Sequence, residues 1–205
     1  MIERNENIRW QDLQGMGIET RQDRNEMELA FFEMKKTRPD VHVEIGAFQG
    51  GSLYYLAGAL DENATIIVID LCDRGEEVHE NLMKVMEILS QDEGFNIHFI
   101  QGRSQDETVL SIMKEQLAGR TIDSAMIDGS HKFGDVMADF NNLKNLMSPG
   151  GRMFFHDVMH KKIGAYKAWL EIQKNVESCF LIFNEEMGLR DHATGIGVAI
   201  PNLKE

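Results

Sequence analysis

Short apolar runs alternate with amphipathic segments along most of this chain. Runs of strand length occupy residues 41–45, 65–69, 96–101, 122–127 and 152–155. Segments with helical spacing of apolar residues precede them at 25–36 and follow them at 52–60, 76–89, 106–117, 133–147 and 163–176. Such alternation predicts an α/β fold in which a parallel sheet is covered by helices on both faces.

Two further runs, 179–183 and 195–200, are not separated by a helical segment. The loop of 11 residues between them favours an antiparallel hairpin at one edge of the sheet. Residues 1–24 are polar, with scattered apolar anchors such as Trp10. We expect them to form an N-terminal extension and residues 25–205 to form one domain.

Composition and charge narrow the class of protein. The 205 residues include 42% hydrophobic residues and carry a formal net charge of -13, which fits one globular domain with a substantial core. Spread negative charge disfavours binding to nucleic acid and favours a small neutral or cationic partner. The sequence has no apolar run of membrane-spanning length and no apolar signal segment near residue 1. Cys72 and Cys179 lie in no metal or redox spacing, which is typical of reduced cysteines in a cytoplasmic protein.

A glycine-rich turn follows the first predicted strand, in the segment VEIGAFQGGS at residues 43–52. The glycines of this turn include Gly46 and Gly50. They either let the backbone approach a ligand closely or allow a tight strand-to-helix turn. Asp70 ends the second strand, 20 positions after Gly50, where an acid can hold ribose hydroxyls. A backbone amide is the alternative partner for this carboxylate.

The turn also indicates which cofactor it binds. Phe48 occupies the second glycine position of the dinucleotide fingerprint, and Glu44 places an acid at the strand end. An acid there repels a pyrophosphate and attracts a sulfonium or amino group, which favours S-adenosylmethionine over NAD. Ser52 is expected to cap the following helix or to contact the cofactor carboxylate at that helix N-terminus.

The third predicted strand is followed by Ser104 and Gln105, whose side chains can hydrogen-bond an adenine edge. Capping of the next helix by Ser104 or Asp106 is the alternative. Asp139, in a later helix, is expected to be structural.

The fourth and fifth strands end in acids that we expect to lie side by side. Asp128 ends the fourth strand, His131 lies three residues on, and His156 and Asp157 follow the fifth. A histidine near neutral pKa can remove a proton from an acceptor hydroxyl. Paired carboxylates suit Mg²⁺, whereas His156 as a third ligand shifts the preference toward Mn²⁺, Fe²⁺ or Zn²⁺. The alternative is two loop-capping acids with His156 in the core.

These motifs, together with VIDL, IDGSH and SPGGRMFFHDV, occur in an order that resembles the class I S-adenosylmethionine-dependent methyltransferases over residues 27–200. The chain is most similar to the group of cephalosporin-hydroxylase-like proteins and macrolide-sugar O-methyltransferases. The resemblance implies a Rossmann-like, doubly wound sheet of seven strands, mostly parallel with an antiparallel final strand.

The resemblance also implies roles for the motif residues. His131 would be the catalytic base beside Asp128. The metal ligands would be Asp128, His156 and Asp157, although the middle position is often acidic in the family. The implied cofactor contacts are Glu44, Gly46, Phe48, Gly50, Ser52, Asp70, Ser104, Gln105 and Asp128.

The function expected from these observations is S-adenosylmethionine-dependent O-methylation of a hydroxyl on a sugar or other small metabolite, assisted by Mg²⁺ or Mn²⁺. A nucleotide-dependent oxidoreductase is one alternative, against which Glu44 and Phe48 count. A non-catalytic cofactor-binding scaffold is another, which His156 keeps open. The acceptor pocket is expected from residues 1–24 and 184–194, and Trp10 with the polar extension suits a subunit contact in a homo-oligomer.

Overall fold

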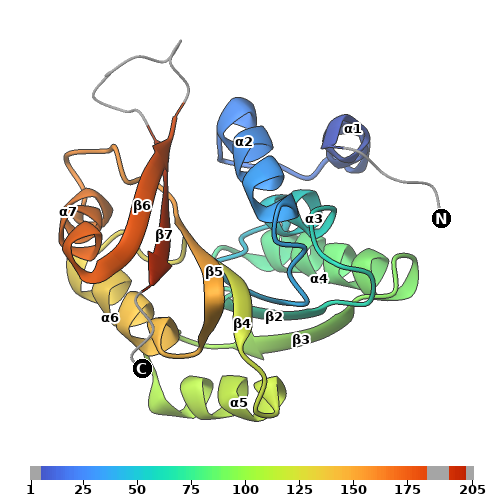
Figure 1. Cartoon of the computed structure of the whole chain (residues 1–205). Coiled ribbons are helices and arrows are strands. Elements are labelled where there is room, and N and C mark those ends of the chain that lie inside the picture. Colours follow the sequence, from blue (N-terminus) through green and yellow to red (C-terminus); the bar gives the residue numbers. More distant parts are fainter. Residues whose placement is uncertain (1–5, 184–193, 202–205) are drawn as a thin grey trace.

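A computed structural model describes residues 6–183 and 194–201 (Figure 1). Within these residues the sheet has seven strands in the order β3-β2-β1-β4-β5-β7-β6. The strands from β1 to β5 pair in parallel, and β7 pairs antiparallel with both β5 and β6. The predicted fold class and its hairpin at one edge are therefore confirmed. The strands are β1 (Val41–Ile45), β2 (Thr65–Asp70), β3 (Asn96–Gln101), β4 (Ile122–Ile127), β5 (Met147–Phe155), β6 (Val176–Ile182) and β7 (Ile196–Pro201).

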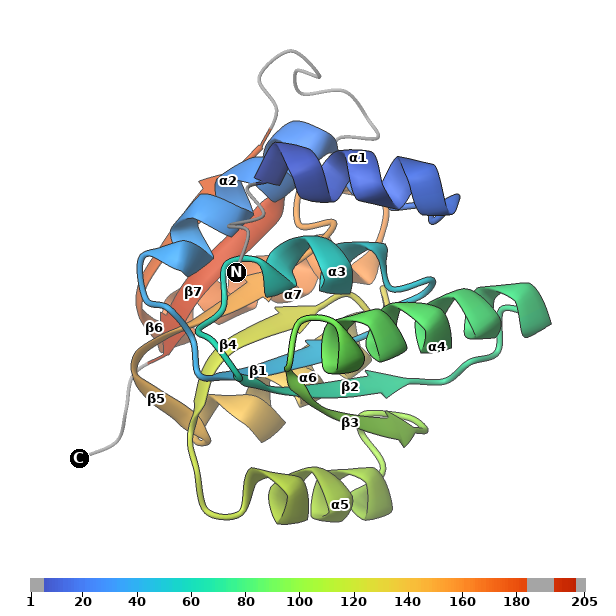
Figure 2. The same ribbon diagram turned by 90° about the vertical axis from the view of Figure 1, so that its right-hand side faces the viewer.

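Helices cover both faces of the sheet, as Figure 2 shows. One face carries α1 (Glu6–Met16), α2 (Arg24–Lys35), α3 (Gly51–Ala57) and α4 (Glu76–Gln91). The other carries α5 (Glu107–Leu117), α6 (Phe133–Lys144) and α7 (Gly164–Ile172), the last continued by the 3₁₀ turn η1 (Gln173–Asn175). Each face has its own apolar cluster.

Strand β1 contributes side chains to both faces of the sheet. Its residues alternate between the faces, so Val43 and Ile45 pack toward α5–α7, while Glu44 projects toward α1–α4. All five of its residues are buried, as expected for a central parallel strand.

The predicted element boundaries needed correction near the last two parallel connections. Helix α6 ends at Lys144 instead of residue 147, because Met147 pairs with Ile122 and thereby begins β5. Helix α7 ends at Ile172, and β6 begins at Val176 instead of residue 179. In both places an apolar residue that fits a helical period, Met147 or Val176, is paired in the sheet instead.

The predicted N-terminal extension contains α1, which lies over α3 (Figure 2). Leu13 is buried in the core, and the Trp10 ring packs edge-on against Tyr55 at 5.6 Å between centroids. Within the described ranges no helix is long and apolar enough to cross a membrane. Residues 184–193, expected to line the acceptor pocket, lie outside the described residues.

Candidate functional site

The carboxyl ends of the central strands meet at one edge of the sheet, as the pattern predicted. Ile45 at the end of β1 pairs with Ile69 of β2 and with Ile127 of β4, and Ile127 pairs in turn with Phe155 of β5. The loops that follow these strands are therefore neighbours, and they carry the glycine turn and the predicted acids.

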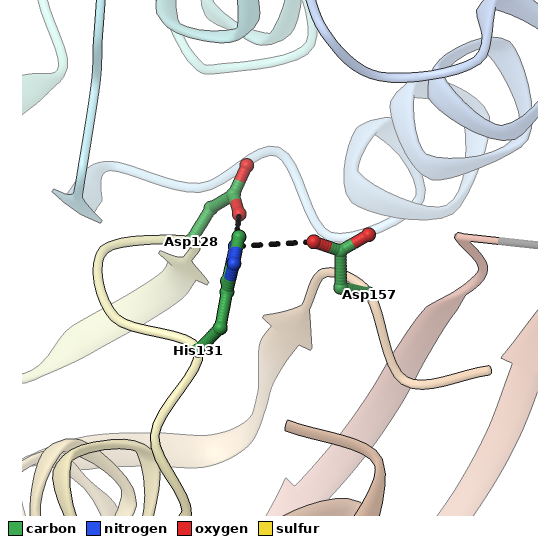
Figure 3. Close-up of side chains that lie close together, drawn as sticks. All are labelled: Asp128, His131 and Asp157. Atoms are coloured by element: carbon green, nitrogen blue, oxygen red, sulfur yellow. Dashed lines mark ion pairs between the residues drawn. The ribbon is translucent and has the colours of Figure 1, made fainter. Parts of the chain in front are cut away.

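Asp128, His131 and Asp157 form a compact cluster at this edge (Figure 3). His131 Nε2 lies 3.1 Å from Asp157 Oδ2 and 3.7 Å from Asp128 Oδ1. One ligand atom from each residue lies within 4.8 Å of the others, which is an arrangement able to hold a divalent cation. Asp157 adopts the left-handed backbone region, with φ of 60°.

His156 lies beside this cluster and not within it. Its Nδ1 is 3.2 Å from Asp128 Oδ1 and 3.6 Å from Asp157 Oδ1, and the residue is only 6% exposed. Burial alone would lower the pKa of His156, but the charges of Asp128 and Asp157 outweigh it and raise this pKa to about 9. His156 is thus placed as a buried counter-ion beside Asp128, whereas the three-residue cluster includes His131. The expectation that His156 ligates a metal stays a prediction.

The two histidines in turn stabilise the ionised form of Asp128. Burial would raise the pKa of this carboxyl. The charge of His156 and the hydrogen bonds that Asp128 makes with the two histidines outweigh burial and hold the pKa well below its usual range. Interaction with Asp128, helped by the charge of Asp157, raises the pKa of His131. His131 is therefore a stronger base than a free histidine, in contact with the carboxylates that would bind a cation.

The segment between α1 and α2 contacts the site. The sequence led us to expect residues 1–24 near the acceptor pocket, but it did not identify the residues that make these contacts. Gln22 Nε2 donates to Asp128 Oδ2 at 2.6 Å, and the Arg21 guanidinium lies 4.6 Å from the centre of the Phe48 ring. Glu19 N donates to Gln49 Oε1 in the glycine turn. No periodic or motif signal marks these residues, because their contacts are entirely long-range.

The glycine turn packs against the loop after β4. Gly46 has a φ of 84°, and a Cβ there would lie 2.5 Å from the Asp128 carbonyl oxygen and closer still to Gly129 Cα. Glycine is thus required at this position by the neighbouring loop, in line with the tight-turn interpretation. The prediction that Gly46 and Gly50 border the cofactor stays a prediction.

Asp70 holds the turn through its backbone. Asp70 Oδ2 accepts hydrogen bonds from the amides of Ala47 and Phe48, and Oδ1 accepts one from Cys72. The alternative partner foreseen for this carboxylate, a backbone amide, is therefore present. A carboxylate accepts about four hydrogen bonds, and backbone amides provide three of them here. The prediction that Asp70 binds a ribose hydroxyl stays a prediction.

Glu44 and Ser52 form a buried pair beneath α3. Ser52 Oγ donates to Glu44 Oε1 at 2.6 Å, and Glu44 is completely buried. The predicted cap is wrong, because Gly50 is the N-cap residue and Ser52 is already inside the helix. The Glu44 charge can act on a bound cofactor only through space, since its side chain is packed under the turn.

Ser104 and Gln105 are joined to a residue of α6. Gln105 Nε2 donates to Ser104 Oγ and to Asp139 Oδ1, both at 2.8 Å. Asp106 is the N-cap residue of α5 but makes no side-chain capping hydrogen bond. Asp139 is 1% exposed, and burial raises its pKa to about 6.

Comparison with known proteins gives one family and several similar folds. The family described as "Methyltransferase domain" matches residues 43–158. An uncharacterized protein, R132 of Acanthamoeba polyphaga mimivirus, is 34% identical over 116 residues, which are 57% of this chain and 50% of the relative. The chain thus matches about half the length of that curated relative.

Two solved structures share the fold across nearly the whole chain. The O-methyltransferase TomG from Streptomyces achromogenes, in complex with SAM, is 14% identical with a TM-score of 0.70, covering 96% of this chain and 89% of its own. An O-methyltransferase from Bacillus cereus, in complex with SAH, is 13% identical with a TM-score of 0.69, covering 95% and 90%. The matched residues 43–158 run from β1 to just beyond Asp157 and so contain the glycine turn and the whole cluster.

Proposed function

Because the chain belongs to the methyltransferase-domain family, we propose that it is an S-adenosylmethionine-dependent O-methyltransferase acting on a hydroxyl of a sugar or other small metabolite. The observation that carries the proposal is the cluster of Asp128, His131 and Asp157 beside the glycine turn. This cluster places a base beside two carboxylates that can hold a cation. It lies at the sheet edge where doubly wound folds bind their ligands.

Residues around the turn would hold the cofactor. Asp70 would accept from a ribose hydroxyl, and Ser104 with Gln105 would offer polar atoms to the adenine. Phe48 and the backbone from Gly46 to Gly50 would line the methionine part. Glu44, although buried, favours the positive sulfonium over the thioether product through space.

The acceptor hydroxyl would lose its proton to His131 Nε2 as its oxygen attacks the methyl carbon. One C–O bond forms and the S–CH₃ bond breaks, so that the sulfonium becomes a neutral thioether and the proton stays on the imidazole. A divalent cation at Asp128, His131 or Asp157 would lower the pKa of the acceptor hydroxyl and orient it. Catalysis would otherwise depend mainly on positioning.

His131 has two possible roles in this scheme, cation ligand and base, and they exclude each other. A histidine that ligates a cation cannot also take a proton at the same nitrogen, so cation binding and proton acceptance compete at Nε2. We expect His131 to act as base when the cation rests on the two carboxylates alone.

Calorimetric titration of S-adenosylhomocysteine tests the proposal directly. We expect micromolar binding to the wild type, weakened at least tenfold in Asp70→Asn, which keeps one acceptor oxygen for the turn. Asp73→Asn is the matched control, because Asp73 lies three residues on and is 64% exposed. Absence of binding to the folded wild type would overturn the proposal.

Metal dependence and catalysis need their own measurement. Methyl transfer from S-adenosylmethionine to a panel of hydroxylated metabolites, with Mg²⁺, Mn²⁺ or chelator, should show turnover that His131→Asn abolishes. Cofactor binding without turnover on any acceptor would favour the scaffold alternative. The expected cytoplasmic location and homo-oligomeric state stay predictions.

A further inference from the structure

Asp139 is a buried carboxyl outside the cluster of the proposed reaction. It lies on α6, is 1% exposed, and accepts hydrogen bonds from Ser104 and, through Oδ1, from Gln105 Nε2. No described residue donates to its Oδ2. Burial of a carboxyl with an unsatisfied oxygen destabilises the fold, and an apolar side chain at the same position would not carry this cost in free energy. The position therefore calls for an explanation beyond packing.

The hydrogen bonds around Gln105 determine which way its amide faces. An ionised carboxylate can only accept, so the amide must turn its NH₂ group toward Asp139. The two hydrogens of Nε2 are then used, one by Asp139 Oδ1 and the other by Ser104 Oγ. Oε1, to which no described residue donates, is the remaining hydrogen-bonding atom of the half-buried side chain.

We propose that Asp139 is a specificity-determining positioning residue, which fixes the Gln105 amide so that the site after β3 presents an acceptor to the ligand base. Such a site selects a base with an exocyclic amino group, as in adenine, over one with a carbonyl at the same position, as in hypoxanthine. The inference rests on the proposed function, which places the adenine of the cofactor at Ser104 and Gln105.

The selectivity follows from pairing rules. An amino group donates to Gln105 Oε1, whereas a carbonyl would put two acceptors face to face and leave both without a donor. Leaving one buried polar group unpaired costs about 1–3 kcal/mol, which corresponds to roughly 5- to 150-fold in affinity. Gln105 alone has no such preference, because an unrestrained amide can rotate to offer its NH₂ group.

The test compares the dissociation constants of S-adenosylhomocysteine and S-inosylhomocysteine, which differ at this base position, by calorimetry. The wild type should prefer the adenosyl compound by roughly 10- to 100-fold. In Asp139→Asn the new amide can donate or accept, so Gln105 is free to rotate and the preference should fall to about threefold or less. Gln105→Ala should lose the preference as well, and adding Asp139→Asn to it should change nothing further.

Asn141→Ala is the matched control, since Asn141 lies on the same helix at an exposed position and contacts Lys144. It should keep the wild-type preference. A purely structural role of Asp139 would weaken both ligands equally, and an unchanged preference in Asp139→Asn would overturn the inference. Equal binding of the two ligands by the wild type would also overturn the inference, but it would leave the proposed function intact. A wild type that binds neither ligand would overturn the proposed function and the inference together.

Discussion

Gln22 Nε2 donates a 2.6 Å hydrogen bond to Asp128 Oδ2 across 106 positions of the chain. The donor belongs to the connection between α1 and α2, and the acceptor directly follows β4. The N-terminal segment is therefore part of the candidate site and holds one of its two carboxylates.

Replacing Gln22 tests this contact. Gln22→Glu places a second carboxylate against Asp128, and we expect the free energy of unfolding at pH 7 to fall by about 1–3 kcal/mol. The matched control is Gln14→Glu, at an exposed position of α1, which should change it by less than about 0.5 kcal/mol. Urea denaturation measures both, and equal midpoints for the two variants would contradict the contact.

Cation binding at the cluster should release protons. Asp128 and Asp157 are paired with His131 and His156, whose pKa values are raised, so a bound cation favours the deprotonated histidines. Affinity for Mn²⁺ should therefore increase as pH rises from about 6.5 to 8.5. Titrations in two buffers of different ionisation enthalpy give the number of protons released. A pH-independent affinity, or binding that survives in Asp157→Asn, would argue against this site.

Asp139 should make folding stability depend on pH. Burial raises its pKa to about 6, against hydrogen bonds from Ser104 and Gln105, whereas the ordinary value is 3.8. Between these values the folded state binds more protons than the unfolded state, so stability falls as pH rises from about 4 to about 6. The loss is on the order of 2–3 kcal/mol.

The comparison with Asp139→Asn isolates this effect from the histidines that titrate in the same range. The difference in unfolding free energy, wild type minus variant, should decrease across the window and stay constant above it. Urea denaturation at half-unit steps of pH measures it. A difference that does not change with pH would show that the Asp139 carboxyl titrates normally.

Gly46 should tolerate no side chain. A Cβ there would contact the backbone of Asp128 and Gly129, and φ is 84°, so we expect Gly46→Ala to cost about 2 kcal/mol or more. Gly134, in α6, has open space around its missing Cβ, and Gly134→Ala should stabilise by about 0.5–1 kcal/mol. Thermal unfolding distinguishes the two, and similar midpoints would mean that the turn and the β4 loop are not packed as described.

The sequence predicted the sheet and the strand-end acids well, because both depend on local patterns. Short apolar runs mark the buried strands, and an acid at the end of such a run predicts the ligand-binding edge, as for Asp70 and Asp128. Parallel order then brings Asp128 and Asp157 together without further information.

Side-chain direction and long-range contacts were not predictable in the same way. The sequence placed His131 near Asp128 but did not reveal its 3.1 Å approach to Asp157, whose backbone lies in the left-handed region. Ser52 was predicted to cap a helix, but its hydroxyl donates a hydrogen bond to Glu44 on the neighbouring strand. The contact of Asp139 with Gln105, 34 positions away, is likewise not marked by any local pattern.

The place of β7 in the sheet has a consequence for the order in which the chain folds. Strand β5, which leads to Asp157, pairs with β4 on one side and with β7 on the other, through Phe155 and Gly197. Until residues 196–201 have been synthesised, β5 remains an open edge whose amides and carbonyls pair with nothing on that side. The half of the site built on β1, β2 and β4 can therefore form early, whereas the Asp157 half is exposed to wrong strand pairing until the last strand inserts.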